Sequence, residues 1–341
     1  MAEKLQAENY ITSNNLARYA DVVFSEALPT KLFQDLHINN VKISKKSNEK
    51  ITLYRLTDFR LKDGDVVFVH SGSIKLLFQY LKKEKDLKNI ILLSHQADYP
   101  IEQKLFKTKP NSISKWFAIN TDYDDKDLIP IPLGIANNYT TNNLLPSHFE
   151  KLNILGKKEE KLYINLVKST NYKEREVALK YFEDLDWAIV KEPTLTLEEY
   201  ANDLNKYKFV FCPWGNGYDT HRFWETLYSG SIPVTKYHST YKNLEGLPVI
   251  FFDDINDINI DFLKTKANEL NFENLNKLKI QYWVDEINKF KKEGPGNTYE
   301  IKEDWFIEIK FKFKSILFSF FEKNLKKARF YTQKIKKFIK V

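Results

Sequence analysis

The stretch KFVFCPWGNGYDTHRFWETLYSGSIPVT, residues 208–235, decides the fold of this chain. Its apolar run FVFCPW (209–214) predicts a buried strand, and IPVT (232–235) predicts a second one. Between them a glycine-containing turn leads into a predicted helix over about 220–229, and Gly230 stands where helices commonly end. A strand, a helix and a strand in this order predict a parallel βαβ unit.

The same alternation of apolar runs and helical patterns extends over most of the chain, and the polar stretch 137–160 interrupts it once. We therefore predict an α/β protein with two nucleotide-fold-like domains, residues 1–150 and 151–304, followed by a tail over 305–341. The expected strands are 65–73, 89–95, 115–120, 128–135, 161–167, 187–190, 209–214, 232–235 and 248–252, and the expected helices are 74–85, 173–185, 196–207, 220–229 and 260–270.

The positive charge of the chain is concentrated at its C-terminal end. The 341 residues include 53 Lys and Arg and 46 Asp and Glu, for a net charge of +7. Residues 305–341 hold eleven Lys or Arg against two Glu, so the preceding part is close to neutral. Nucleic-acid binding therefore has no support in the folded part. The tail predicts basic amphipathic helices that first pack across the domains and then, over about the last twenty residues, adsorb to an anionic membrane surface. The alternative is a solvated basic helix without a partner.

The location is expected to be cytoplasmic. No run of about 18 uninterrupted apolar residues predicts a membrane-spanning helix, and the first fifteen residues lack the apolar core of a secretory signal. The tail leaves peripheral attachment to the inner face of the membrane open. Cys212 is the only cysteine, which excludes an intramolecular disulfide and a thiolate zinc cluster.

The turn before the helix at 220–229 has the properties of an anion site. Gly215 and Gly217 allow close approach of a ligand, and the free N–H groups and dipole of a helix N-terminus attract anions. The turn lacks the third glycine of the dinucleotide fingerprint and the Lys of a Walker loop. Glu225, one turn into the helix, can accept hydrogen bonds from two vicinal hydroxyl groups such as those of a ribose. The alternatives are a tight turn capped by Asp219 and a surface ion pair of Glu225.

The block from 208 to 235 resembles the signature of exostosin-like, inverting GT-B-type glycosyltransferases, which runs as strand, Pro, Gly-rich turn, D-T-H-R, aromatic, Glu and I-P-V. Weaker similarity covers INLVKSTNYKER (164–175) and IPIPLGI (129–135), so that about half of the chain is included. The resemblance implies the GT-B architecture of two facing Rossmann-like domains. It also implies a nucleotide-sugar donor on the C-terminal domain and the acceptor on the N-terminal one. Much of the first sixty residues matches nothing in the family.

The resemblance further implies roles for individual residues of the block. The turn would lie against the diphosphate, the D-T-H-R segment would line the phosphate and the sugar, and the glutamate would hold the ribose. These residues are Gly215, Asn216 and Gly217 for the diphosphate, Asp219, Thr220, His221 and Arg222 for the phosphate and sugar, and Glu225 for the ribose.

Lys168 and Arg175 are candidates for neutralising the charge of a leaving diphosphate. The segment VKSTNYKER places them just beyond a predicted strand and in the first turn of a predicted helix. Cationic side chains and amides can stabilise such a leaving group in place of a metal ion. Either residue could equally be a solvated surface charge. We predict no cofactor and no metal ion.

A transfer with inversion needs a base on the acceptor side, within hydrogen-bond reach of the attacking hydroxyl. His95 and Asp98 follow the predicted strand 89–95, at the strand edge where α/β folds bind ligands. Either could take the proton, although a strand-end His and an Asp before Tyr-Pro are also common turn residues. His70 and Ser71, at the end of the preceding strand, are a weaker second choice.

The acidic segment TDYDDKD (121–127) contains the D-x-D spacing with which GT-A-type transferases hold a divalent ion. No second donor signature surrounds it, so a solvated turn is the preferred interpretation. Asp253 and Asp254 are interpreted in the same way.

These patterns together predict a glycosyltransferase that moves a sugar from a nucleotide-sugar donor to a hydroxyl group of a growing glycan, such as a bacterial surface polysaccharide or a lipid-linked glycan. The alternative is a catalytically silent nucleotide- or glycan-binding protein on the same scaffold. Neither the nucleotide nor the acceptor can be deduced from these residues.

Overall fold

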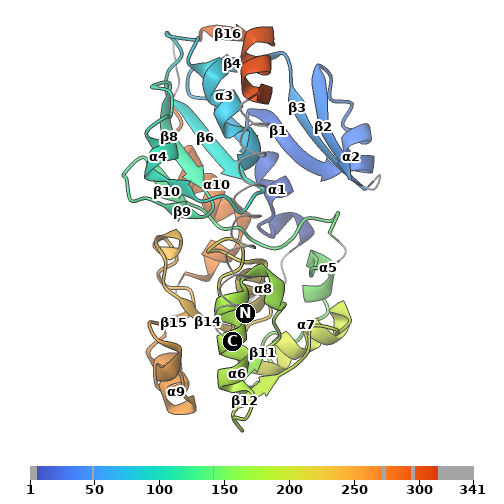
Figure 1. Ribbon diagram of the computed structural model, residues 1–341, viewed down its shortest axis with the longest axis vertical. Coiled ribbons are helices and arrows are strands. Elements are labelled where there is room, and N and C mark those ends of the chain that lie inside the picture. Colours follow the sequence, from blue (N-terminus) through green and yellow to red (C-terminus); the bar gives the residue numbers. More distant parts are fainter. Residues whose placement is uncertain (1–5, 48–49, 141, 271–273, 293–295, 314–341) are drawn as a thin grey trace, which may run out of the picture.

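Two α/β units stack along the long axis of the molecule, each built around its own sheet (Figure 1). The computed structural model describes residues 6–47, 50–140, 142–270, 274–292 and 296–313. The fold is a mixed α/β fold with largely parallel sheets, compatible with two Rossmann-like domains. The predicted fold class is confirmed at this level.

The first sheet has seven strands in the order β10-β8-β6-β5-β1-β3-β2. The strands from β10 to β1 are parallel, whereas β3 pairs antiparallel with both β1 and β2. The four strands predicted in this half are present, and β1, β2 and β3 are additional to the prediction. The bounds are β1 Val22–Pro29, β2 Val41–Ser47, β3 Ile51–Leu56, β5 Val66–His70, β6 Ile90–His95, β8 Ile113–Ala118 and β10 Leu128–Pro130.

The second sheet has five parallel strands in the order β12-β11-β13-β14-β15. All five strands were predicted. The chain runs from β11 outward to β12 and then crosses back to β13, so the strand order reverses between β11 and β13. The bounds are β11 Glu159–Ile164, β12 Ala188–Val190, β13 Tyr207–Phe211, β14 Ile232–Lys236 and β15 Ile250–Phe252.

Helices α6 and α8 cover opposite faces of the second sheet. Ala178 and Phe182 of α6 join the apolar cluster that belongs to this unit alone. Phe223 and Trp224 of α8 instead join a cluster that also holds Phe117 of the first unit, so one continuous core crosses between the units. The helices are α1 Ser13–Ala17, α2 Thr30–Asp35, α3 Ile74–Leu81, α4 Gln103–Phe106, α5 Pro146–Phe149, α6 Tyr172–Phe182, α7 Leu197–Lys206, α8 His221–Tyr228, α9 Ile260–Glu269 and α10 Ile280–Asn288.

The chain returns to the first unit before its C-terminal end, which differs from the predicted domain boundary at 304. Trp283 of α10 packs into the shared core, and β16 (Thr298–Ile301) pairs with β4 (Phe59–Lys62) of the first unit. In Figure 1 both α10 and β16 lie within the upper unit. The second unit therefore ends before about 280. A local sequence pattern does not reveal this, because the contacts join residues more than 200 positions apart.

The start of the predicted tail is helical over 305–313 and is fixed to the first unit. Its Glu308 forms an ion pair with Arg55 and accepts a hydrogen bond from Tyr80 Oη at 2.6 Å. The remainder of the tail, 314–341, lies outside the described residues, so its membrane contact stays a prediction. Among the helices that the structure describes, none is long and apolar enough to cross a membrane.

Candidate functional site

The glycine turn lies at the point where the strand order of the second sheet reverses. It follows the carboxyl end of β13, and the carboxyl end of the neighbouring β11 leads into α6. Crevices at such reversal points are the usual ligand sites of open α/β sheets. Gly215 N–H donates to the Gly217 carbonyl at 3.0 Å, which closes the turn and leaves Asn216 exposed at its tip.

Two arginines lie near this turn and within electrostatic range of each other. Arg175 is 8% exposed and donates from Nη1 to the Val167 carbonyl at 2.9 Å and from Nε to the Trp214 carbonyl at 3.3 Å. It thereby ties the ends of β11 and β13 together, and its Nη2 is the atom nearest to Gly215, 3.2 Å from where a Cβ would stand. Burial, together with the nearby charge of Arg222, lowers the pKa of Arg175 to about 10.

Arg222, in the first turn of α8, carries an unused donor. Its Nη1 is buried and is without a hydrogen-bond partner among the residues that the structure describes. The guanidinium stacks on the Tyr200 ring at 5.3 Å from its centre. Burial lowers the pKa of Arg222, whereas Tyr200, Cys212 and Glu225 raise it, and the net direction is upward. The group therefore stays charged and has hydrogen-bonding capacity left for an anion.

An open cavity of about 420 Å³ adjoins the turn on the α6 face of the sheet. Its volume lies within the range of small-ligand sites. Trp214 contributes an indole N–H that is buried and unpartnered in the described part of the chain. The lining residues are Lys173, Glu174 and Val177 of α6, the strand-end residues Phe211, Lys236 and Phe252, and Trp214 and Ile255.

Three further residues were predicted to contact the donor, namely Thr220, His221 and Lys168, and each has a different environment. Thr220 caps α8 and accepts a hydrogen bond from the Phe223 N–H at 3.4 Å. His221 Nδ1 contacts the Gly134 carbonyl of the first unit at 2.8 Å. Lys168 lies in a short 3-10 helix beyond β11 and is exposed. Of the predicted donor-site cations, Arg175 thus lies against the turn, Arg222 lies within electrostatic range of Arg175, and Lys168 is exposed beyond β11.

Asp219 is committed to the junction between the units. It is 3% exposed and accepts hydrogen bonds from the N–H groups of Leu133 at 2.8 Å and Thr220 at 2.9 Å, and from Trp224 Nε1 at 2.9 Å. Burial raises the pKa of Asp219 to about 7, although these hydrogen bonds oppose the shift. No exposed surface of this carboxylate faces the crevice, so its role in donor binding rests on the resemblance alone.

Glu225 is likewise enclosed. It is 3% exposed and accepts hydrogen bonds from Tyr200 Oη at 3.0 Å and from the Leu144 N–H at 3.4 Å. Leu144 belongs to the connection between the two units. Glu225 could therefore bind a ribose only if this connection moved away from its carboxylate.

Asn120 fixes the turn to the first unit. Its backbone adopts a left-handed conformation with φ of 52°, and its Oδ1 accepts a hydrogen bond from the Asp219 N–H at 2.9 Å. A Cβ at Gly217 would lie only 2.6 Å from Asn120 Nδ2. Glycine is therefore needed at 217 because of close contact, and the same contact positions the turn.

We expect Gly217→Ala to lower the free energy of unfolding by about 1–3 kcal/mol, because the added methyl group displaces a buried amide. Urea unfolding measures the loss. Asn120→Gly removes the clashing side chain and suits the left-handed backbone, so the double variant should lose less than the two single losses added together. Strictly additive losses would contradict the proposed contact.

His95 is buried, and both of its ring nitrogens have hydrogen-bond partners within the protein. It is 1% exposed, its Nε2 contacts the Pro132 carbonyl at 3.1 Å, and its Nδ1 accepts from the Gln96 N–H at 2.9 Å. Burial lowers its pKa to about 3. With both ring nitrogens used, His95 has no free position for a substrate proton, and we do not carry it forward as a base. Asp98 is exposed in the loop after β6.

The second-choice candidates for the base, His70 and Ser71, also have hydrogen-bond partners within the protein. His70 Nδ1 accepts from the Gly72 N–H at 3.1 Å, and burial lowers the pKa of His70 to about 4. Ser71 Oγ donates to the His95 carbonyl at 2.9 Å.

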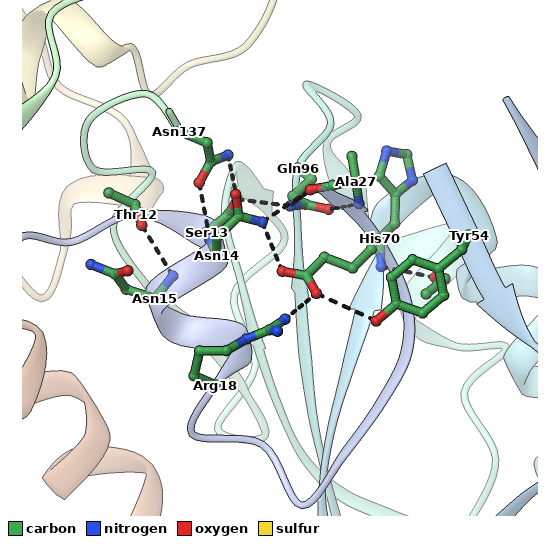
Figure 2. A network of polar contacts seen from close by, with 12 residues as sticks. Thr12, Ser13, Asn14, Asn15, Arg18, Ala27, Tyr54, His70, Gln96 and Asn137 are labelled. Atoms are coloured by element: carbon green, nitrogen blue, oxygen red, sulfur yellow. Dashed lines mark hydrogen bonds and ion pairs between the residues drawn. The ribbon is translucent and has the colours of Figure 1, made fainter. Parts of the chain in front are cut away.

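A buried polar network around Glu26 was missed by the sequence analysis (Figure 2). Glu26 lies on β1 and is 0% exposed. Asn14 Nδ2 donates to its Oε1 at 2.7 Å, Arg18 forms an ion pair with its Oε2, and Tyr54 Oη lies 3.5 Å from the same oxygen. The available signal was an acidic residue inside the apolar run VVFSEAL (22–28).

The acidic segment 121–127 pairs with the second unit. Asp122 lies 3.4 Å from His238 Nε2 and accepts from Tyr218 Oη at 3.3 Å, while Asp124 forms an ion pair with Lys242. Within the described ranges, no group of three or more His, Cys, Asp or Glu residues could hold a metal ion. Asp122 and Asp124 of the D-x-D segment are exposed, as a solvated turn predicts, and both also contact the second unit.

No protein-family model matches the chain, and no curated protein matches it.

Proposed function

We propose that the chain is a GT-B-type glycosyltransferase that moves a sugar from a nucleotide-sugar donor to a hydroxyl group of a glycan. One observation carries the proposal: Arg175 lies against a glycine turn and within electrostatic range of Arg222, and Arg222 has a buried donor without a partner in the described residues. The two like charges repel each other; Glu225 near Arg222 and Glu174 near Arg175 offset part of this repulsion, and a bound anion would offset more of it.

The charge of the two arginines suits a diphosphate. Guanidinium groups bind phosphate oxygens in a bidentate manner, and the amides of the turn and of the α8 N-terminus add donors of the same kind. The adjoining cavity offers space for a further part of the donor. During transfer the bond between the anomeric carbon and the phosphate breaks, and the two arginines meet the charge that develops on the leaving diphosphate.

The finer parts of the proposal rest on the resemblance to exostosin-like enzymes. These parts are inversion at the anomeric carbon, the identity of the acceptor as a bacterial surface or lipid-linked glycan, and cytoplasmic action at the membrane surface through the basic tail.

A thermal-shift panel of UDP-, GDP-, CMP- and ADP-sugars tests the donor class. A ligand that binds only the folded protein raises its melting temperature, and a concentration of 100 times Kd adds about 2.7 kcal/mol of stability. We expect one nucleotide series to raise the melting temperature by about 3 °C or more, with and without EDTA. Free sugars without a diphosphate serve as the control.

A panel without any shift would contradict the proposal. A shift without release of nucleotide from any donor, whatever acceptor is added, would instead favour the silent nucleotide-binding protein.

A further inference from the structure

The first sheet has its own reversal point, between β1 and β5. From β1 the chain turns to β2 and β3 on one side and then continues to β5 and β6 on the other. Ser25 of β1 is the last residue that pairs with β5, and Glu26 is the next residue. Glu26 therefore lies at the carboxyl end of the parallel strands, where open α/β sheets bind ligands.

The Glu26 carboxylate has an unused acceptor position. A carboxylate offers about four lone-pair sites on its two oxygens. Oε2 faces Arg18 and Tyr54, whereas Oε1 accepts one hydrogen bond, from Asn14 Nδ2 at 2.7 Å. Among the described residues no second donor is bonded to Oε1, so one of its lone pairs is left for a hydroxyl group.

The covering group over Glu26 is a surface side chain. The Glu26 side chain is 0% exposed, but that of its ion-pair partner Arg18 is 38% exposed. Access of a hydroxyl group to the carboxylate would require Arg18 to move away from it.

Further amide and hydroxyl groups, which suit a sugar, lie beside Asn14, the amide partner of the carboxylate (Figure 2). Gln96 donates to Ser13 Oγ at 2.9 Å and to the Ala27 carbonyl at 3.0 Å, and its backbone is held at φ of 71°. Left-handed backbone at a residue other than glycine is concentrated at functional sites. Asn137 Nδ2 donates to the same Ser13 Oγ at 2.7 Å.

The connection between the units leads from this network to the proposed donor site. Asn137 contacts Ser13, and Tyr139 accepts a hydrogen bond from Asn137 at 3.0 Å and lies within electrostatic range of Glu26. Leu144, further along the same connection, contacts Glu225 of α8.

On the basis of the function proposed above, we propose that Glu26 is the catalytic residue that takes the proton from the attacking hydroxyl group of the acceptor. The hydroxyl proton moves to Glu26 Oε1 as the oxygen forms its bond to the anomeric carbon. The bond from that carbon to the phosphate oxygen breaks, and its electron pair leaves with the nucleoside diphosphate.

The electrostatic environment of Glu26 suits this task. Burial raises the pKa of Glu26 to about 7, against the lowering effect of Arg18, Asn14 and Tyr54. A base whose pKa lies near the working pH accepts a proton most effectively. Tyr139 is the other titratable group that faces the carboxylate, and burial raises its pKa.

The test compares Glu26→Gln with a matched control, Glu308→Gln. Glu308 also pairs with an arginine and a tyrosine, Arg55 and Tyr80, but lies on the helix at 305–313, outside both candidate sites. The assay follows nucleoside diphosphate release from the nucleotide sugar that gives the largest thermal shift, with water or added glycan as acceptor. We expect Glu26→Gln to bind the donor within about two-fold of the parent and to release product about 100- to 10,000-fold more slowly. Glu308→Gln should retain parental turnover.

A second variant separates chemistry from folding. Azide attacks without losing a proton, so azide should restore release by Glu26→Ala, which a structural role for Glu26 does not predict. Full turnover of Glu26→Gln, or no azide rescue of a folded Glu26→Ala, would overturn the assignment while leaving the donor proposal intact. A parent that binds a nucleotide sugar but releases nothing at any pH would also overturn it. A parent that binds no nucleotide sugar would overturn the proposed function and this inference together.

Discussion

Replacement of Arg222 by Gln is expected to weaken binding of the nucleoside diphosphate by about 30- to 5,000-fold. The guanidinium carries a buried Nη1 with no partner in the described part of the chain, and a phosphate oxygen is the acceptor that it lacks. Loss of one partner of a buried charged pair typically costs about 2–5 kcal/mol. Isothermal titration with the nucleotide that gives the largest thermal shift measures the change. Arg175→Gln should weaken binding by a similar factor, with an added loss of stability because Arg175 also holds the Val167 carbonyl.

Two further variants define what the Arg222 result means. Arg222→Lys keeps the charge but loses the bidentate geometry, so its affinity should lie between those of the parent and Arg222→Gln. Arg60→Gln removes an exposed arginine on β4 that pairs with Glu300, and it should leave affinity unchanged. An Arg222→Gln protein that is less stable yet binds nucleotide normally would show that Arg222 only supports the Tyr200 side chain.

The buried parallel strands could be predicted because each is a continuous apolar run. FVFCPW and NIILLSH give β13 and β6 directly, since a strand covered on both faces exposes no polar side chains. The edge strand β2, VKISKKS, lacks this signal because lysines interrupt it. The four-residue β16 exists only through its pairing with β4, which local sequence does not indicate.

The candidate site could be predicted in part for the same reason. The glycine turn and Arg222 lie within one continuous block, so their proximity follows from the sequence. The hydrogen bond from Leu133 to Asp219 joins residues 86 positions apart, so the block at 208–235 does not indicate it. From the block alone, Asp219 is predicted to bind the ligand. For Glu26, an acidic residue within an apolar strand could be recognised in the sequence, but its hydrogen-bonding partners could not be predicted.

Replacement of Asp219 by Ala is expected to lower the free energy of unfolding by about 3–5 kcal/mol. The change leaves three buried donors without an acceptor, namely the N–H groups of Leu133 and Thr220 and the indole N–H of Trp224. Each buried donor left unpaired costs about 1–3 kcal/mol. Urea unfolding measures the loss. Asp254→Ala removes an exposed carboxylate that caps a short helical turn, and it should cost about 1 kcal/mol or less.

The pH dependence of stability provides the second measurement on Asp219. Burial raises its pKa to about 7 in the folded protein, whereas an unfolded Asp titrates near 4. The folded state therefore binds more protons between these values, and the contribution of Asp219 is fully present below about pH 4 and is lost as the pH rises through 7. The parent should lose up to about 1.4 kcal/mol per pH unit from this group, and Asp219→Asn should lack that part of the slope. Glu26 titrates in both proteins, so the difference between the two slopes belongs to Asp219. Two outcomes would contradict a structural role at the junction and favour a role in donor binding. One is an equal pH dependence of stability in the parent and in Asp219→Asn. The other is an Asp219→Ala protein that has parental stability but no longer binds nucleotide.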